Sequence, residues 1–319
     1  MAAYPEMLRR DRLRRGFALL LLAAGFVACD REVGCDELSD AGEEGRPFEP
    51  VSTDYPIVAA AGDIASQGAP CAGDRATAAL VARMDPTVVL VLGDNQYTRG
   101  TLTEFRSSYD RTWGRFKKIT WPTPGNHEYR TEGARGYFDY FGRQAEPPAG
   151  YYSFELGTWH LVAINSGNGD IGQEQHSWIR MDLASDDHRC QLAYWHHPLW
   201  TSGTVEGADP QPQDLDALWS TLFDAGVDVV LNGHAHQYER FSQLNPSGQI
   251  DPVHGIREFV VGTGGGKFHE FGDVVYGSEV RDADNYGVLE LTLRDDAYGW
   301  RFVSVDGRVL DEGEGACHL

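Results

Sequence analysis

Apolar and polar positions along the chain alternate in a way that predicts strands and helices in turn. Residues 87–92 form a continuous apolar, β-branched run, which is typical of a strand buried on both faces of a mostly parallel sheet. Residues 55–61 predict an earlier strand, and residues 74–84 predict a helix between the two. Strand, helix and strand in this order are the pattern of a parallel sheet with helical crossovers.

The same pattern continues toward the C-terminus. Further helices are predicted over residues 102–113, 133–141, 173–183 and 215–225, and further strands over residues 119–124, 151–156, 159–164, 190–195 and 227–231. A Gly157-Thr158 turn joins two of these strands into a hairpin, which we expect to lead into a second sheet. Residues 238–304 predict more strands with glycine-rich connections. The expected fold class is α/β, with one domain over residues 54–319.

Polar side chains follow five of these strands at their C-terminal ends. They are Asp63, Asp94 with Tyr97, Asn126 with His127, His196, and His234 with His236. Open α/β sheets bind ligands at this edge, so we expect these side chains to converge if the strands are neighbours in one sheet. Carboxylate, imidazole, phenol and amide groups suit iron, zinc or manganese. Seven of these residues are potential ligands, too many for one tetrahedral ion, and they suit two metal ions about 3.5–4 Å apart that share a carboxylate.

Each motif taken alone has an ordinary structural explanation. Asp63 is a common kind of turn residue, residues 125–128 fit a loop, and His196-His197 fits a structural pair. Two histidines at alternate positions, His234 and His236, are more specific, because a loop can present both imidazoles to one site. The prediction of a metal centre therefore depends on all five motifs together.

The order of the motifs resembles the calcineurin-like metallophosphoesterase superfamily, and within it the purple acid phosphatase branch. The resemblance covers Ile57 to His236 by motif and extends to about residue 305. The superfamily usually carries a metal-binding His two residues after the first Asp, and that position is Ala65 here. The purple branch also lacks this His and has a Tyr three residues after the second Asp, as Tyr97 is here. The resemblance implies a four-layer α/β/β/α metallophosphoesterase sandwich.

The resemblance also implies a ligand set and a reaction. One ion, expected to be Fe(III), would be held by Asp63, Tyr97 and His236; a second, Zn, Fe or Mn, by Asn126, His196 and His234; and Asp94 would bridge them. His127 would contact the phosphate or protonate the leaving oxygen. The implied reaction is hydrolysis of a phosphoester, in which hydroxide formed from metal-bound water attacks phosphorus in line.

The other histidines give weaker signals. His197 stands where plant and animal purple enzymes commonly have Ser, and we expect it to contact a ligand or the substrate. His160 is expected in the core or on a sheet surface, and His269 is a candidate for the cleft wall. No partner is visible in the sequence for four others, which we expect to be structural or on the surface: His176, His188, His254 and His318.

The net charge of the chain is −21. Residues 1–28 carry five Arg against two acidic residues, a net of +3, so the remainder is near −24. Such an acidic body argues against nucleic-acid binding through a basic surface. An anionic phosphoester substrate would need strong local positive charge, which metal ions supply.

The N-terminus predicts export. Five Arg between Arg9 and Arg15 precede an apolar stretch, Phe17 to Ala28, that is short for a bilayer span. Residues 26–29 resemble a lipoprotein processing box, so residues 1–29 are predicted to be a signal peptide ending at Cys29, a possible site of lipid anchoring. Arg14-Arg15 fits a twin-arginine signal or an Arg-rich ordinary secretory signal. The expected location is periplasmic, lipid-anchored at the cell surface, or secreted, with residues 30–53 as a polar tether.

The remaining cysteines are Cys35, Cys71, Cys190 and Cys317. Four cysteines in an exported protein predict up to two disulfides, with three possible connectivities.

Three functions remain open from the sequence. The first is a phosphomonoesterase, and the second is a phosphodiesterase or nucleotidase on the same site. An open cleft beyond residues 200–208 would favour diesters. The third is a non-enzymatic, metal-binding surface lipoprotein, against which the complete ligand set and His127 argue.

Overall fold

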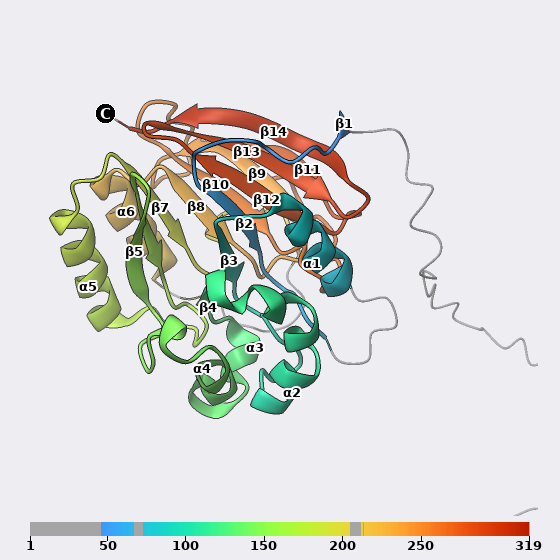
Figure 1. Cartoon of the computed structure of the whole chain (residues 1–319). Coiled ribbons are helices and arrows are strands. Elements are labelled where there is room, and N and C mark those ends of the chain that lie inside the picture. Colours follow the sequence, from blue (N-terminus) through green and yellow to red (C-terminus); the bar gives the residue numbers. More distant parts are fainter. Residues whose placement is uncertain (1–45, 67–72, 205–211, 213, 319) are drawn as a thin grey trace, which may run out of the picture. The chain divides into compact units, whose positions relative to one another are not determined.

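The structure is a computed structural model that describes residues 46–66, 73–204, 212 and 214–318 (Figure 1). The predicted signal peptide, Cys29, Cys35 and Cys71 lie outside the described residues. In the described part of the chain, no helix combines the length and apolarity that crossing a bilayer requires.

Two seven-stranded sheets form the centre of the fold (Figure 1). The first sheet contains, in spatial order, β1 (Arg46–Pro47), β14 (Arg308–Ala316), β13 (Ala297–Ser304), β12 (Gly287–Leu293), β2 (Ile57–Ala61), β3 (Val88–Leu92) and β4 (Thr120–Thr123). The second contains β11 (Ser278–Asp282), β9 (Tyr238–Leu244), β10 (Ile256–Val261), β8 (Val229–Asn232), β7 (Cys190–Tyr194), β6 (Trp159–Ala163) and β5 (Tyr152–Leu156). The hairpin β5–β6 belongs to this second sheet, as expected.

Strands β2, β3 and β4 are parallel neighbours. All five residues of β2 and all five of β3 are buried, as the continuous apolar runs predict. In the second sheet β6, β7, β8 and β10 are also parallel neighbours. Each sheet therefore presents a group of strand C-termini at one edge.

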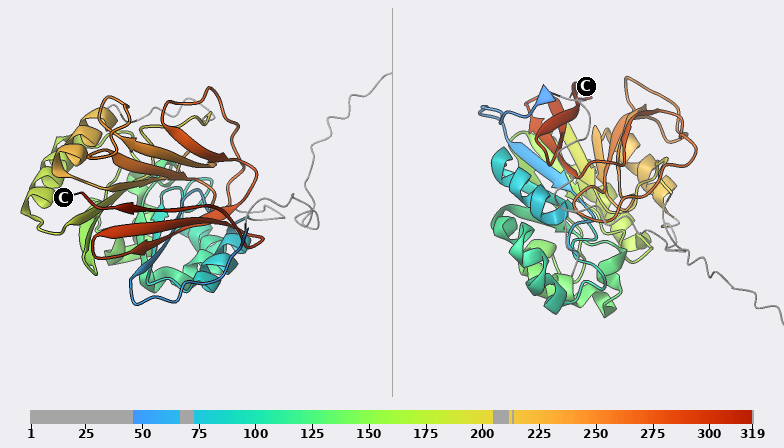
Figure 2. Two further views of the ribbon diagram at one scale, coloured as in Figure 1. Left: turned by 90° about the horizontal axis from the view of Figure 1, so that it is seen from above. Right: turned by 90° about the vertical axis from the view of Figure 1, so that its right-hand side faces the viewer.

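Helices cover the outer face of each sheet (Figures 1 and 2). On the first sheet α1 (Gly73–Met84) packs beside β12, while α2 (Leu102–Ser107), the short α3 (Asn126–Tyr129) and α4 (Arg135–Phe141) pack against one another in the segments that follow β3 and β4. The second sheet is covered by α5 (Gly172–Ser185) and α6 (Leu215–Ala225). One apolar core joins α1, the first sheet and the inner face of the second, and another lies between the second sheet and α5 and α6. The predicted four-layer α/β/β/α sandwich is confirmed.

The helix predicted over residues 102–113 is shorter than expected. Thr101 caps α2, whose last residue is Ser107, and Ser108 has non-helical angles (φ −126°, ψ −76°). Two 3₁₀ helices continue the segment, η1 (Tyr109–Arg111) and η2 (Trp113–Ile119). Phe105, Tyr109 and Trp113 are fully buried, so packing of these aromatic side chains decides the local path of the backbone. The remaining short 3₁₀ turns are η3 (Glu132–Ala134) and η4 (Gly142–Ala145).

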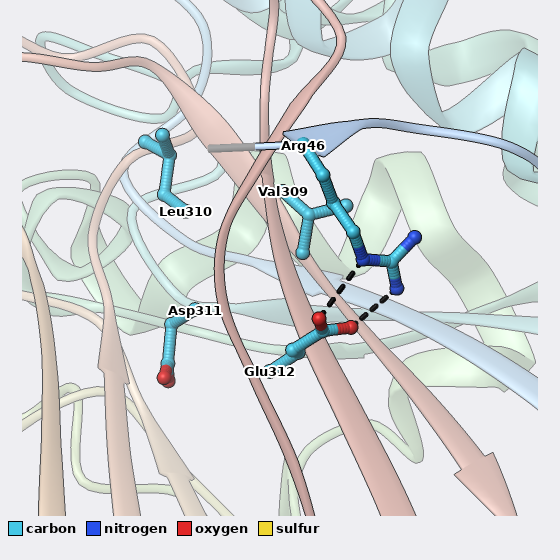
Figure 3. Close-up of a pocket in the computed structure, with 5 residues that line it drawn as sticks. All are labelled: Arg46, Val309, Leu310, Asp311 and Glu312. Carbon is cyan, nitrogen blue, oxygen red and sulfur yellow. Dashed lines mark hydrogen bonds and ion pairs between the residues drawn. The ribbon is translucent and has the colours of Figure 1, made fainter. Parts of the chain in front are cut away.

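The first sheet extends further at both ends of the domain than the sequence indicates. Strand β1 lies within the predicted polar tether and pairs with β14, which itself lies beyond residue 305. Arg46 donates from Nε to Glu312 Oε1 at 2.9 Å and makes a second contact from Nη2, beside a hollow lined by Val309 and Leu310 (Figure 3). Phe48 is buried in the main core. The tether prediction is therefore wrong for residues 46–48.

Strand β14 leads to the single disulfide among the described residues, Cys190–Cys317. Cys190 is the first residue of β7, so the bond joins the end of the first sheet to the beginning of a central strand of the second.

Candidate metal centre

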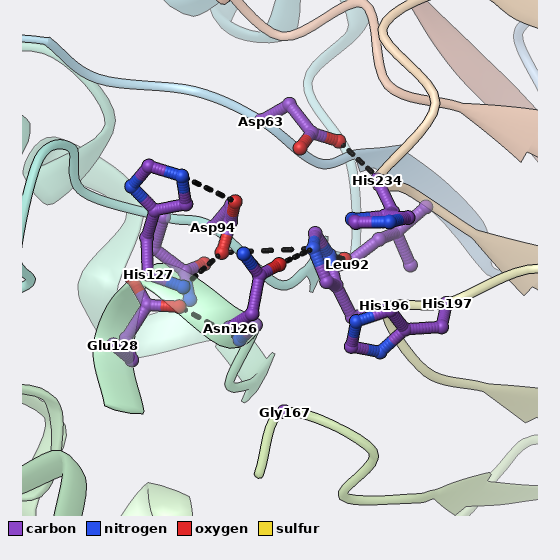
Figure 4. A network of polar contacts seen from close by, with 12 residues as sticks. Asp63, Leu92, Asp94, Asn126, His127, Glu128, Gly167, His196, His197 and His234 are labelled. Carbon is purple, nitrogen blue, oxygen red and sulfur yellow. Dashed lines mark hydrogen bonds and ion pairs between the residues drawn. The ribbon is translucent and has the colours of Figure 1, made fainter. Parts of the chain in front are cut away.

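The predicted site residues converge, but they come from two sheets and not from one. The ends of β2, β3 and β4 in the first sheet lead to Asp63, Asp94 and Asn126. The ends of β7 and β8 in the second sheet lead to His196 and His234 (Figure 4). Neighbouring strands in one sheet, the condition under which convergence was expected, are therefore not what brings these residues together. The facing edges of two packed sheets bring the same side chains together.

Close packing of the strand ends depends on glycines. A Cβ on Gly93 (φ +82°) would lie 2.5 Å from Nδ1 of His196, and a Cβ on Gly125 would lie 2.2 Å from Oδ1 of Asp94. Asp63, Asp94 and His234 have positive φ angles of 60°, 46° and 66°. Such angles are uncommon for residues other than glycine and concentrate at functional sites.

Asp63, Tyr97 and His236 form one group of polar atoms. The Tyr97 hydroxyl donates to Oδ1 of Asp63 at 2.8 Å and lies 2.9 Å from Nε2 of His236. Nε2 of His236 is 3.2 Å from the same Asp63 oxygen. Burial and the carboxylates of Asp63 and Asp94 raise the pKa of Tyr97 well above its ordinary value. A phenolate at this position therefore requires a strongly positive ion beside it.

A second group contains Asp94, Asn126 and His196. Nε2 of His196 lies 3.0 Å from Oδ1 of Asn126 and 3.5 Å from Oδ1 of Asp94 (Figure 4). His234 approaches from the second sheet, with its ring centroid 4.9 Å from that of His196. Its backbone N–H donates to Oδ2 of Asp63 at 2.7 Å, which links the two groups.

Backbone carbonyls fix which nitrogen of each histidine faces the centre. Nδ1 of His196 lies 2.9 Å from the carbonyl oxygen of Leu92, and Nδ1 of His236 lies 2.6 Å from that of Lys267. These contacts leave Nε2 of both rings directed at the site, an arrangement typical of metal-ligating histidines.

His234 supplies a test of whether metal fits. Its Nε2 is buried and has no hydrogen-bond partner among the described residues. Burial and the neighbouring His196 lower the pKa of His234 well below its ordinary value, which favours the neutral ring that a metal ligand requires. A buried polar atom without a partner is costly unless an ion completes it. The donor set, with Asp63, Asp94 and His196 also grouped closely enough to hold one ion, fits metal.

His127 lies at the edge of the site on α3. Its backbone N–H donates to Oδ1 of Asp94 at 2.8 Å, and its Nδ1 lies 2.8 Å from the carbonyl oxygen of Thr98. Nε2 faces Oδ2 of Asp94 at 3.8 Å. Burial lowers the pKa of His127 below its ordinary value, although Asp94 opposes that effect.

Glu128 is a site residue whose role is not evident from the sequence alone. It is fully buried and accepts hydrogen bonds from the backbone N–H groups of Gln96, at 3.1 Å, and Gly125, at 2.7 Å. It therefore ties the loop after β3 to the loop after β4. Its position at the start of α3, three residues after Gly125, is the signal that could have identified it.

Two further histidines lie against the centre. His197 is buried, its Nδ1 is 2.9 Å from the Ser166 hydroxyl, and its ring centroid is 4.4 Å from that of His234. His269 stacks on His236 with centroids 4.0 Å apart, and its Nδ1 accepts from the backbone N–H of His236 at 3.3 Å. The contact of His197 with His234, a predicted ligand, fits the expectation for His197, and the place of His269 in a cleft wall stays a prediction.

Comparisons with known proteins agree with this geometry. Residues 57–238, more than half of the chain, match the family model described as calcineurin-like phosphoesterase. Purple acid phosphatase 15 of Arabidopsis thaliana is 30% identical over 218 residues, which cover 57% of this chain and 40% of that protein. Probable inactive purple acid phosphatase 1 of the same plant is 32% identical over 181 residues, covering 50% of this chain and 29% of that protein. This chain thus spans less than half the length of these relatives.

Among solved structures, purple acid phosphatase PPD1 from yellow lupin (Lupinus luteus) seeds superposes with a TM-score of 0.70 at 21% identity. The match covers 85% of this chain and 55% of the lupin chain. The chain is a member of the calcineurin-like phosphoesterase family, whose members bind two metal ions, and it is related to the purple acid phosphatases.

Proposed function

We propose that this protein is a phosphomonoesterase of the purple acid phosphatase type, with a dinuclear centre. The proposal assigns Asp63, Tyr97 and His236 to an Fe(III) ion. It assigns the second ion, Zn, Fe or Mn, to Asn126, His196 and His234, with Asp94 as the bridge. The observation that carries the proposal is the buried Tyr97 hydroxyl, 2.8 Å from Asp63 and 2.9 Å from His236, because an anionic phenolate suits a hard ferric ion.

Two metal ions at this position would bind phosphoryl oxygens and lower the pKa of a water molecule. The chain's own residues orient and complete the site. Asp94 receives the His127 backbone N–H, which holds α3 and its imidazole beside the centre. The Thr98 carbonyl fixes the ring of His127 so that Nε2 faces the space beside Asp94. From there, Nε2 contacts the phosphate or delivers a proton to the leaving oxygen.

The dinuclear assignment is tested by metal content and visible absorption of protein purified without chelators. We expect about two metal ions per chain and a purple charge-transfer band that dithionite removes. Tyr97→Phe should abolish the band. Tyr129→Phe is the matched control, because the Tyr129 hydroxyl contacts Asn165, at 2.7 Å, and no group of the centre. A colourless protein with two zinc or manganese ions would refute the ferric assignment while keeping a hydrolase.

The reaction is tested with a phosphomonoester and a phosphodiester of the same alcohol, p-nitrophenyl and bis-p-nitrophenyl phosphate. Faster turnover of the monoester supports the proposal, and faster turnover of the diester favours the diesterase alternative. The predicted role of a cleft beyond residues 200–208 stays a prediction, since residues 205–208 lie outside the described part of the chain.

One relative carries the name probable inactive purple acid phosphatase 1, so the experiments must also distinguish an enzyme from a non-enzymatic protein. Asn126→Ala should remove most of the hydrolytic rate if the protein is an enzyme. A wild-type protein that binds metal after reconstitution but hydrolyses neither substrate would leave the alternative of a non-enzymatic, metal-binding protein. Export and lipid anchoring through Cys29 stay predictions; metabolic labelling with a fatty acid, compared with Cys29→Ala, tests the anchor.

A further inference from the structure

A second group of histidine and aspartate side chains lies on the outer face of the second sheet, away from the dinuclear centre. His160 is in β6, His188 and Asp186 are in the connection from α5 to β7, and Asp182 is in the last turns of α5. His160, Asp186 and His188 each offer one ligand atom, and these atoms lie within 4.8 Å of one another. We propose that these three residues form a separate site for a zinc ion, with water in the fourth position.

Asp182 prepares His160 for this role. Nε2 of His160 lies 2.7 Å from Oδ2 of Asp182, whose other oxygen accepts from the Ser153 hydroxyl at 2.7 Å. An N–H at Nε2 that donates to Asp182 leaves the lone pair on Nδ1. A carboxylate, a histidine and a metal in this order are a recurrent arrangement that fixes the tautomer of the ligating ring.

The distance between His160 and Asp186 suits a shared ion better than a hydrogen bond. Nδ1 of His160 lies 3.6 Å from Oδ1 of Asp186, too far for an N–H···O bond. Ligand atoms around tetrahedral zinc, with bonds of about 2.0–2.1 Å, lie about 3.3–3.4 Å apart. Nδ1 of His188 is 2.6 Å from the same oxygen, so this contact has to open by less than about 1 Å.

The side chains have the freedom and the support that the site needs. The His188 side chain is 21% exposed, so its ring can shift toward the outside. Asp186 is held in place because its Oδ2 accepts a hydrogen bond from Nε2 of Gln191 at 2.8 Å. Its other oxygen, Oδ1, faces the two histidines. The rings of His160 and His188 lie nearly parallel, at 19°, with centroids 6.2 Å apart.

The local charge also favours a cation. Glu155 lies opposite His160 in the β5–β6 register, which adds a third carboxylate to those of Asp182 and Asp186. Two imidazoles and a carboxylate are a common ligand set for zinc, while oxygen-preferring ions would lose the histidines.

The site is independent of the proposed dinuclear centre. Gln191 pairs with His160 across β6 and β7, and His196 follows β7 at its other end. His196 is five positions after Gln191, which corresponds to roughly 16 Å of extended chain. Zinc at this position would therefore fasten the α5–β7 connection to β6, and its role would be stabilising.

The test compares zinc binding by wild-type protein, His188→Ala and His254→Ala after removal of bound metal. His254 is the matched control, since it is 72% exposed in its side chain and faces one carboxylate, Asp251, at 3.9 Å. At micromolar free Zn²⁺, calorimetry and metal analysis should give one zinc ion more per chain for wild type and His254→Ala than for His188→Ala. Because the readout is a difference, it does not depend on whether the dinuclear centre is loaded.

Two further measurements separate a site from a general loss of structure. Asp182→Asn keeps all three ligands and should weaken this zinc site by about 10- to 100-fold. At free Zn²⁺ about 100 times the dissociation constant, the melting temperature of wild type should rise by about 5 °C more than that of His188→Ala. Equal zinc stoichiometry in wild type and His188→Ala, or a zinc-induced shift that is the same in both, would overturn the proposal.

Discussion

The disulfide Cys190–Cys317 joins residues 127 positions apart, so it closes a loop of about two fifths of the chain. A cross-link of this kind restricts the unfolded chain, and a loop of 127 residues corresponds to about 5 kcal/mol in the chain-entropy model. Measured losses on removal of native disulfides are about 2–5 kcal/mol. We therefore expect Cys190→Ala with Cys317→Ala to lower the free energy of unfolding by about 3–5 kcal/mol.

The assay is equilibrium unfolding in urea without reductant, which leaves any pairing of Cys35 and Cys71 unchanged. The proposed phosphoester hydrolysis should proceed in the folded double variant at a rate close to wild type, because the bond lies at the start of β7 and His196 follows its end. Contacts that remain at the C-terminus, such as the His318 N–H to Oδ1 of Asp228 at 2.6 Å, should still order that segment. A loss below about 1 kcal/mol would refute the chain-entropy reasoning for this loop.

Three further predictions concern the site and a buried carboxyl. Replacing His127 by Gln should lower kcat about 10²- to 10⁴-fold for alkyl phosphates and much less for p-nitrophenyl phosphate, whose leaving group needs no proton; equal losses would leave His127 as a phosphate contact alone. Gly125→Ala should lower metal content and activity, measured by metal analysis and turnover, because its Cβ would lie 2.2 Å from Oδ1 of Asp94. Burial, with Glu239 nearby, raises the pKa of Glu258 well above its ordinary value. The native state therefore keeps a proton on Glu258 at pH values where the unfolded state has lost it, so the free energy of unfolding falls as pH rises from about 4.3 toward the native pKa. Glu258→Gln should therefore gain stability relative to wild type between pH 5 and pH 8 in urea unfolding, and a difference that is independent of pH would contradict this.

Much of the fold was predictable because its central strands are buried on both faces. Continuous apolar runs identified β2 and β3, and the helix between them placed the two strands in parallel. Asp63 and Asp94 follow directly after these two runs, so the predicted strand ends also identified two of the candidate site residues. Periodicity was less informative for residues 108–119, where buried aromatic side chains support 3₁₀ turns in place of a regular helix.

The outer zinc site could not be predicted, because its members share no sequence motif. His160 lies in an apolar strand and is 28 residues from His188, so neither shows a partner in the sequence. They meet because β6 and β7 are parallel neighbours and the α5–β7 connection crosses the beginning of both strands. The expectation that His188 has a surface or structural role did not include its contact with Asp186 at 2.6 Å. Side-chain clusters of this kind depend on strand order, which local patterns do not contain.

The glycines that precede the predicted ligands have a second structural role, which is not evident from the sequence. As turn residues they explain how each strand ends, but the structure shows that two of them provide space between the sheets. A Cβ on Gly93 of the first sheet would meet His196 of the second, and a Cβ on Gly233 of the second would lie 2.7 Å from Oδ2 of Asp63 of the first. The ligands can share one centre because the backbones at these positions approach closely from both sides. The repeated Gly-Asp and Gly-His pairs therefore allow the two sheets to approach closely and also supply the predicted metal ligands.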